Sequence, residues 1–173
     1  MQAKRANALS AADLATIIQQ LDFGSTLSEQ LISQLASSAV VLDLRRRRFV
    51  YRAGDPADSL YAIVHGTIKL CRIDHDTERE AVIDILSEGS LFGESALYST
   101  AGRRENSAVA YANSRLLRIP SGDFQKGMAE DHRLHDYTFR LIGQRLEQAE
   151  RRLADFALNA IPCLLYTSPS PRD

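Results

Sequence analysis

The sequence predicts a mainly β protein with flanking helices: a jelly-roll, or double-stranded β-helix, followed by one long C-terminal helix. Three observations carry this prediction. Residues 40–119 break into short runs rich in β-branched and aromatic residues, separated by turns that contain glycine. Apolar residues recur at helical spacing before these runs, over residues 10–35, and after them, over residues 139–156. The 173 residues, 45% hydrophobic with a formal net charge of -1, suit one domain plus an appended element.

Two short helices are expected at the N-terminus, where residues 1–20 form a helical arm. Ser10 and Ser28 are suitable N-caps, and Gly24-Ser25 separates the two helices. The apolar positions at helical spacing are Leu14, Ile17, Ile18, Leu21, Leu27, Leu31 and Leu35.

The β-roll is expected over residues 21–125. The stretches "VVLDLRRRRFVYRAGDPADSLYAIVHGTIKLCRI" and "REAVIDILSEGSLFGESAL" predict short strands, and a last pair over 107–111 and 115–119 is closed by Pro120. Arginines 45–48 are expected on a strand, where alternate side chains face opposite sides, so that at most half line one surface. Solvated arginines paired with nearby acids are the expected outcome, and a nucleic-acid or RNA polymerase contact is the alternative.

A second helical pattern follows Pro120, and we expect one helix over 126–158. Its apolar residues are spaced 3, 4, 3, 4, 3 and form a narrow seam with charged flanks. A twin helix in a second subunit would cover such a seam, which predicts a homodimer; packing of the helix on its own roll is the alternative. The seam consists of Phe139, Ile142, Leu146, Ala149, Leu153 and Phe156.

The stretch "GSLFGESALYSTAGRRENSAVA" places Glu94 in a turn and Arg104 ten residues later, with small residues between them. A short helix that starts near Gly93 presents backbone N–H groups, which attract an anion. The Glu94 carboxylate can accept hydrogen bonds from hydroxyl groups, and the Arg104 guanidinium can donate charge-assisted bonds to an anionic group. Together, Glu94 and Arg104 suit a small ligand that carries both hydroxyl groups and an anionic group.

With "YRAGDPADSLYAIVHGTIKL", this stretch resembles a cyclic-nucleotide-binding domain, and the long helix places the resemblance with the Crp/Fnr family of bacterial transcription regulators. The resemblance covers roughly residues 21–162. It implies an effector-sensing, dimeric, non-enzymatic protein in which Glu94 binds a ribose and Arg104 binds a cyclic phosphate. The implied effector-binding residues are Phe92, Gly93, Glu94, Ser95, Arg104, Glu105 and Asn106.

The resemblance also implies a helix-turn-helix domain beyond Pro162, reached through a hinge at 159–162, so that DNA is contacted only by that missing part. The last stretch, "CLLYTSPSPRD" over 163–173, breaks the local pattern and back-translates into a transposon-end adapter used in sequencing libraries. We interpret it as a non-native tail. Specific binding of operator DNA is not expected of this chain.

Two departures from the family pattern leave the effector open. Glu105 follows Arg104 where relatives that bind cyclic AMP tend to have a small residue, although Arg103 could neutralise it. Ala149 and Glu150 stand where cyclic-AMP-responsive relatives carry hydroxyl residues. Cyclic AMP, cyclic di-GMP, another small anion and no ligand are the alternatives. A stand-alone cyclic-nucleotide-binding module is the second functional hypothesis; a cupin-like enzyme is the third, although the chain has no His-x-His pair.

Cofactors and compartment are limited by what the chain lacks. No cysteine precedes Cys71, which alternates with apolar neighbours and is expected to be a buried structural thiol, so neither an iron–sulfur cluster nor a disulfide is expected. His132 and His135 are expected in solvent, without a metal. The chain has neither an apolar run of ~20 residues nor a signal-peptide pattern, and a cytoplasmic protein without a membrane contact is expected.

Overall fold

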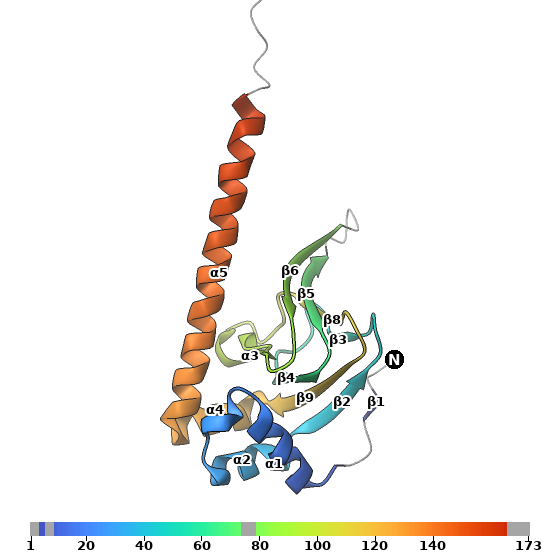
Figure 1. Cartoon of the computed structure of the whole chain (residues 1–173), viewed down its shortest axis with the longest axis vertical. Helices are drawn as coiled ribbons and strands as arrows, with labels where there is room; N and C mark the ends of the chain where they lie inside the picture. The colour runs from blue at the N-terminus through green and yellow to red at the C-terminus, as the bar shows by residue number, and fades with distance from the viewer. Residues whose placement is uncertain (1–3, 6–8, 74–78, 166–173) are drawn as a thin grey trace, which may run out of the picture. The chain divides into compact units, whose positions relative to one another are not determined.

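The strands of the roll lie in two antiparallel sheets in a computed structural model that describes residues 4–5, 9–73 and 79–165 (Figure 1). One sheet has the order β1-β2-β9-β4-β7 and the other the order β3-β8-β5-β6. The mainly β fold with a long C-terminal helix is confirmed. The strands are β1 (Lys4–Arg5), β2 (Val40–Leu44), β3 (Phe49–Tyr51), β4 (Ser59–His65), β5 (Ile68–Ile73), β6 (Glu80–Leu86), β7 (Leu91–Phe92), β8 (Ser107–Ala110) and β9 (Ser114–Pro120).

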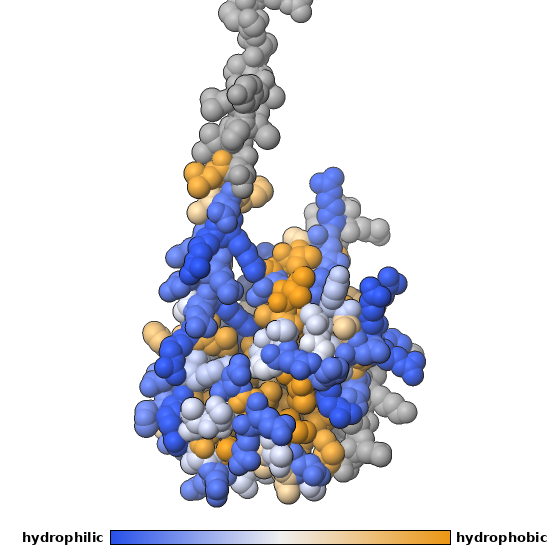
Figure 2. All heavy atoms as spheres, in the orientation of Figure 1, coloured by the Kyte–Doolittle hydropathy of each residue, from blue (hydrophilic) through white to orange (hydrophobic). Residues whose placement is uncertain are grey.

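The core of the roll is formed by inward-facing side chains of both sheets. Ile63 on β4 and Leu116 on β9 come from one sheet, and Ile68 on β5 and Ala110 on β8 come from the other; all four belong to one buried cluster. Alternation along the strands produces this arrangement, because successive side chains point to opposite faces of a sheet. The edge strand β6 is mostly exposed and contributes to the apolar patch near the middle of Figure 2.

Two short helices precede the roll, as predicted: α1 (Ala11–Gln20) and α2 (Glu29–Ser38), with the 3-10 turn η1 (Gly24–Thr26) between them. Both expected caps are confirmed. The Ser10 hydroxyl accepts the N–H of Asp13 at 3.2 Å, and the Asp13 carboxylate accepts the N–H of Ser10 at 3.0 Å. The Ser28 hydroxyl accepts the N–H of Leu31 at 3.3 Å. These bonds satisfy N–H groups that a helix start leaves without intrahelical partners.

The prediction that arginines 45–48 lie on a strand is wrong. β2 ends at Leu44 and β3 begins at Phe49, so the four arginines form the connection between the two sheets. The N–H of Arg48 donates to the carbonyl of Arg45 at 3.1 Å, which closes a β-turn. All four side chains are exposed, so they are not divided between two faces.

The single helix predicted over 126–158 is two helices, α4 (Ser121–Glu130) and α5 (His132–Leu165). Asp131 separates them because its backbone is extended (φ -131°, ψ 109°) and its carboxylate accepts the N–H of Arg133 at 2.9 Å, as an N-cap does. No described helix is both long enough and apolar enough to cross a membrane.

The helix also continues past the predicted hinge at 159–162, because its backbone is helical to Leu165. Of the tail assigned to 163–173, residues 166–173 lie outside the described part. The chain divides into two units, Met1–His135 and Asp136–Asp173, which are described separately.

Candidate ligand-binding site

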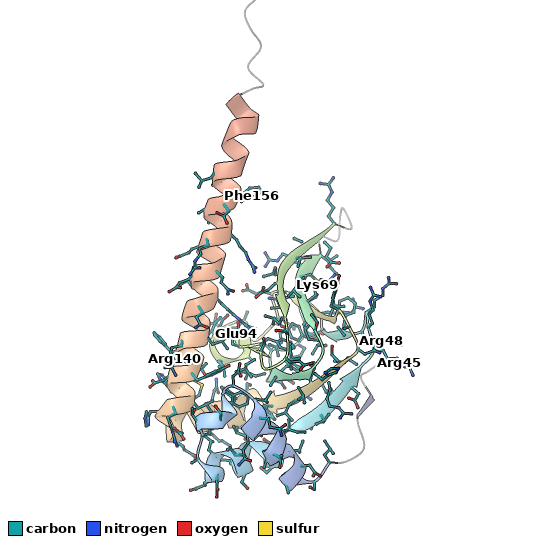
Figure 3. The ribbon with its side chains drawn as sticks, viewed as in Figure 1. Arg45, Arg48, Lys69, Glu94, Arg140 and Phe156 are labelled. Carbon is teal, nitrogen blue, oxygen red and sulfur yellow. The ribbon has the colours of Figure 1, made fainter. Side chains whose placement is uncertain are left out.

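The turn that carries Glu94 depends on the glycine before it. Gly93 follows β7, has a φ of +80°, and leads into the single helical turn α3 (Ser95–Tyr98). A Cβ at Gly93 would lie 3.1 Å from Nη1 of Arg104 and 3.2 Å from Cδ2 of Tyr61. The positive φ and this close packing both require glycine. Figure 3 shows Glu94 beside α3; its side chain is partly exposed.

Arg104 lies eleven residues beyond Gly93 in the chain, and its side chain returns to this turn. Its Nη1 donates to the carbonyl of Gly93 at 2.8 Å and lies 3.4 Å from the hydroxyl of Ser95. Its Nη2 donates to the carbonyl of Ser59 at the start of β4. The backbone of Arg104 is fixed as well, because its N–H donates to Asp55 and its carbonyl accepts from Gly54, both at 2.8 Å. The structure therefore joins the predicted arginine to the predicted turn.

Aromatic rings form the other side of the Arg104 environment. The guanidinium carbon lies 4.3 Å from the ring centre of Tyr51 and 5.7 Å from that of Tyr61. A cation over an aromatic face is attracted by the ring quadrupole. Burial raises the pKa of Tyr61, and the positive charge of Arg104 opposes this rise.

One donor of Arg104 has no partner within the part of the chain that the structure describes. The residue is only 3% exposed, and its Nε–H is buried without a hydrogen-bond acceptor. A buried N–H that gives up water without gaining an acceptor costs roughly 1–3 kcal/mol. Most buried polar groups in proteins are satisfied, so this one indicates a place where another acceptor belongs.

The other predicted site residues have different roles. Phe92 is fully buried and stacks on Tyr61, with ring centres 5.4 Å apart, so it supports the site from the core. The Asn106 side chain accepts a hydrogen bond from the hydroxyl of Tyr51 at 3.3 Å. Glu105 is exposed; Arg103, expected to neutralise it, donates to the carbonyl of Gly54 at 2.8 Å.

Fewer amides are available at α3 than the sequence suggests. The N–H of Ala96 donates to Gly93 at 3.1 Å, and the N–H of Leu97 donates to Glu94 at 2.8 Å. These bonds close the single turn and occupy two of the backbone N–H groups expected to attract an anion. Charge recognition at this turn therefore depends on Arg104 more than on the backbone.

Sequence reasoning missed three contributors to the site, namely Ser59, Tyr51 and Tyr61. Ser59 acts through its backbone carbonyl, which carries no side-chain signal. The two tyrosines occupy inward positions on β3 and β4, where an apolar residue would also satisfy the strand pattern. Polar aromatic residues at inward positions were the available signal, because a buried tyrosine hydroxyl usually needs a partner.

The remaining candidate groups are one thiol and two histidines. Cys71 is fully buried in β5, as predicted, and burial raises the pKa of its thiol. His132 and His135 are exposed. Within the described ranges, no group of three or more histidine, cysteine or acidic residues could hold a metal ion.

The predicted apolar seam is present on α5 within the second unit. Its members are exposed in the single chain: Leu146 by 61%, Leu153 by 69% and Phe156, labelled in Figure 3, by 75%. Large apolar side chains in such a row seldom remain in water, because each one buried contributes roughly 1.5–3 kcal/mol.

Comparison with known proteins agrees with this geometry. A family model described as "Cyclic nucleotide-binding domain" matches residues 41–131. A CRP-like cAMP-activated global transcriptional regulator of Mycobacterium tuberculosis is 26% identical over 131 residues, which cover 76% of this chain and 58% of that protein. The global nitrogen regulator of Synechococcus elongatus is 28% identical over 159 residues, covering 82% and 69%.

A solved structure supports the fold independently. The sensor domain of the transcriptional regulator DNR from Pseudomonas aeruginosa matches with a TM-score of 0.70 at 20% identity, covering 82% of this chain and 93% of that one. The chain spans 58% of the length of the M. tuberculosis relative. This chain belongs to the cyclic nucleotide-binding domain family, and its relatives are transcription regulators of the Crp/Fnr type.

Proposed function

We propose that this chain is the ligand-sensing and dimerisation part of a Crp/Fnr-type DNA-binding transcription regulator in the cytoplasm. Family membership and the regulators among its relatives support this proposal. DNA contact through a further domain, and the activity of a whole regulator, belong to the proposal, because the chain spans 58% of its M. tuberculosis relative.

The observation that carries the proposal is the buried Arg104 guanidinium with its unpartnered Nε–H, directly beside the turn of Glu94. An anionic ligand group would supply the missing acceptor. A charge-assisted hydrogen bond to such a group contributes roughly 1.5–3 kcal/mol. Glu94, one residue beyond the carbonyl that Arg104 binds, would accept hydrogen bonds from ligand hydroxyls. A cyclic nucleotide carries both groups.

Dimerisation through α5 is the second part of the proposal. The exposed Leu146, Leu153 and Phe156 follow the spacing of a two-helix seam, and a second copy of the chain would bury them. A ligand that favours one arrangement of the paired helices would then change how an attached DNA-binding domain is presented.

Calorimetry with cyclic AMP, cyclic GMP and cyclic di-GMP tests the ligand site. We expect saturable binding of at least one of them, and a loss of tenfold or more in affinity for Glu94→Ala. Glu29→Ala, which removes an exposed acid from α2, is the control and should leave affinity unchanged. No heat of binding for any of the three, or equal losses in both variants, would contradict the assignment.

Sedimentation equilibrium tests the dimer. The variant Leu146→Glu/Leu153→Glu should be monomeric, because it places charges in the seam. Gln144→Glu/Gln148→Glu adds the same charge at exposed positions outside the seam and should remain dimeric. A monomeric wild-type chain, or dimers that survive the seam variant, would disprove pairing through α5.

A further inference from the structure

The turn between β2 and β3 presents four consecutive arginines, 45–48, on a fixed backbone; we call it the arginine turn. Besides the internal bond between Arg48 and Arg45, the N–H of Arg46 donates to the side-chain oxygen of Asn113 at 2.9 Å. The N–H of Arg47 donates to the carbonyl of Ala110 at 2.7 Å. The backbone is therefore tied to the roll, and the side chains are displayed from a rigid base.

The side chains of the arginine turn are exposed and make no hydrogen bond or ion pair with any described residue. Asp43, the nearest acid in the sequence, is bound by Arg115 through two bonds of 2.7 and 3.1 Å. Figure 3 shows Arg45 and Arg48 directed away from the roll, and the same side is deep blue in Figure 2. The sequence-based expectation that nearby acids pair with these arginines is not met among the described residues.

Arg47 occupies a position that disfavours it. Its φ is 68°, and it is the only described non-glycine residue with a positive φ. The third position of a turn with positive φ favours glycine or asparagine, and a side chain there costs roughly 1 kcal/mol. The turn thus carries one of its four positive charges at a position where glycine would make the folded chain more stable. Folding stability does not explain the arginine.

We propose that the arginine turn binds the phosphate backbone of duplex DNA without reading its sequence. A guanidinium is planar, always charged and less strongly hydrated than an ammonium, so it fits phosphate oxygens well. Duplex DNA offers such groups in closely spaced rows. Because the formal net charge of the whole chain is -1, attraction to a polyanion must come from a local surface of this kind.

The charge count predicts how salt affects binding. If all four arginines contact phosphates, the logarithm of the affinity falls with the logarithm of salt concentration with a slope of about -3.6, or about -0.9 for each phosphate. Raising salt from 50 to 200 mM would then weaken binding roughly 150-fold. This contact is distinct from the effector site and from sequence-specific binding through a further domain.

Fluorescence anisotropy of the present chain with a labelled 24-base-pair duplex, in 20–200 mM KCl, tests the proposal. The test variant is Arg45→Ser/Arg46→Ser/Arg47→Gly/Arg48→Ser, in which glycine preserves the backbone at position 47. The control Arg140→Gln/Arg145→Gln/Arg151→Gln/Arg152→Gln removes the same number of positive charges from α5. Circular dichroism establishes that both variants are folded.

We expect the wild type and the control to bind DNA with similar affinity, and each to bind duplexes of unrelated sequence equally well. The slope of log affinity against log salt concentration should lie between about -2 and -4. The test variant should lose at least tenfold in affinity at 20 mM KCl. Equal losses in the two variants would overturn the proposal, because general charge would then suffice. Absence of DNA binding would overturn it too. Binding to polyglutamate but not to DNA would assign the turn to an acidic protein surface and would also overturn it.

Discussion

Arginine is used in opposite ways in two regions of this molecule. Arg104 is 3% exposed; its two terminal nitrogens donate to the carbonyls of Gly93 and Ser59, and its plane lies over Tyr51. The arginines of the β2–β3 turn are exposed, and their guanidinium groups make no hydrogen bond to any described residue. The same side chain thus holds a site together in one region and is displayed to solvent in the other.

The difference shows what each charge contributes to the fold. A buried guanidinium must keep its partners, because a buried charge without partners is costly. An exposed one contributes little to folding, since water and salt screen it. Arg133 is intermediate: it is exposed, yet it binds the buried Asp131 carboxylate at 2.7 and 3.0 Å. Substitutions in the three places should therefore differ in size and even in sign.

The largest effect is expected for Arg104→Ala. It removes the donors that bind the carbonyls of Gly93 and Ser59 and leaves both carbonyls without them, so unfolding free energy should fall by about 3 kcal/mol. Arg103→Ala, next to it, removes one exposed contact and should cost under about 1 kcal/mol. Urea denaturation of both variants measures the difference; equal costs would show that Arg104 does not hold the turn.

Gly93→Ala should have the next largest effect, about 2 kcal/mol. The new Cβ would lie at a positive φ and within 3.3 Å of Arg104, Tyr61 and Ser59. Gly102→Ala shares the positive φ but has no atom within 4 Å of the new Cβ, and should cost only about 1 kcal/mol. Thermal unfolding of both variants separates the cost of the backbone conformation from the cost of the close contacts. If Gly102→Ala destabilised the fold as much as Gly93→Ala, the close contacts of Gly93 with Arg104 would not contribute.

Asp131→Asn should cost about 1–2 kcal/mol at pH 7. The hydrogen bond from Arg133 is the main cause that lowers the pKa of Asp131 to about 2. Because this pKa lies below the ordinary aspartate value of 3.8, the stabilisation is present at neutral pH and is lost as the pH falls from about 4 to about 2. The unfolding free energies of the wild type and of Asp131→Asn should converge over that pH range. A constant difference between them would show that the lowered pKa of Asp131 does not stabilise the fold.

The smallest effect is a gain. Arg47→Gly should stabilise the fold by about 0.5–1 kcal/mol, because glycine accepts the φ of 68° without strain. Arg46→Gly, at the neighbouring turn position, where φ is not positive, should destabilise it by a similar amount. Chemical denaturation compares the two. A loss of stability in Arg47→Gly would mean that the arginine serves the fold after all.

Periodicity and caps were sufficient to predict most of the fold. The alternation of the strands, the serine caps of α1 and α2 and the seam of α5 are local patterns, and the structure contains each of them. The arginine turn was missed because β-branched and apolar neighbours on both sides made a continuous strand the simpler prediction. The break at Asp131 was missed because an acid that caps one helix resembles a charged surface residue of a longer one.

The proximity of Arg104 to the turn of Glu94 could be predicted from the sequence, but the interactions that fix it could not. Spacing brought Glu94 and Arg104 together as a hypothesis, and the bond from Arg104 to Gly93 joins the arginine to the turn. That Arg104 binds backbone carbonyls could not be predicted, because carbonyls are common to every residue. Phe92 was assigned to the ligand, but its place in the stack with Tyr61 depends on how the sheets pack.

The central claim is that Arg104 receives the anionic group of an effector, and nuclear magnetic resonance of its side chain tests it most directly. In an ¹⁵N-labelled chain, the Nε–H signal of Arg104 is assigned by its loss in Arg104→Lys and followed during titration with cyclic nucleotides. We predict a saturable downfield shift of this signal, as the unpartnered donor gains an acceptor, while the signal of Arg103 stays in place. Saturable binding that leaves the Arg104 signal unmoved would contradict the claim.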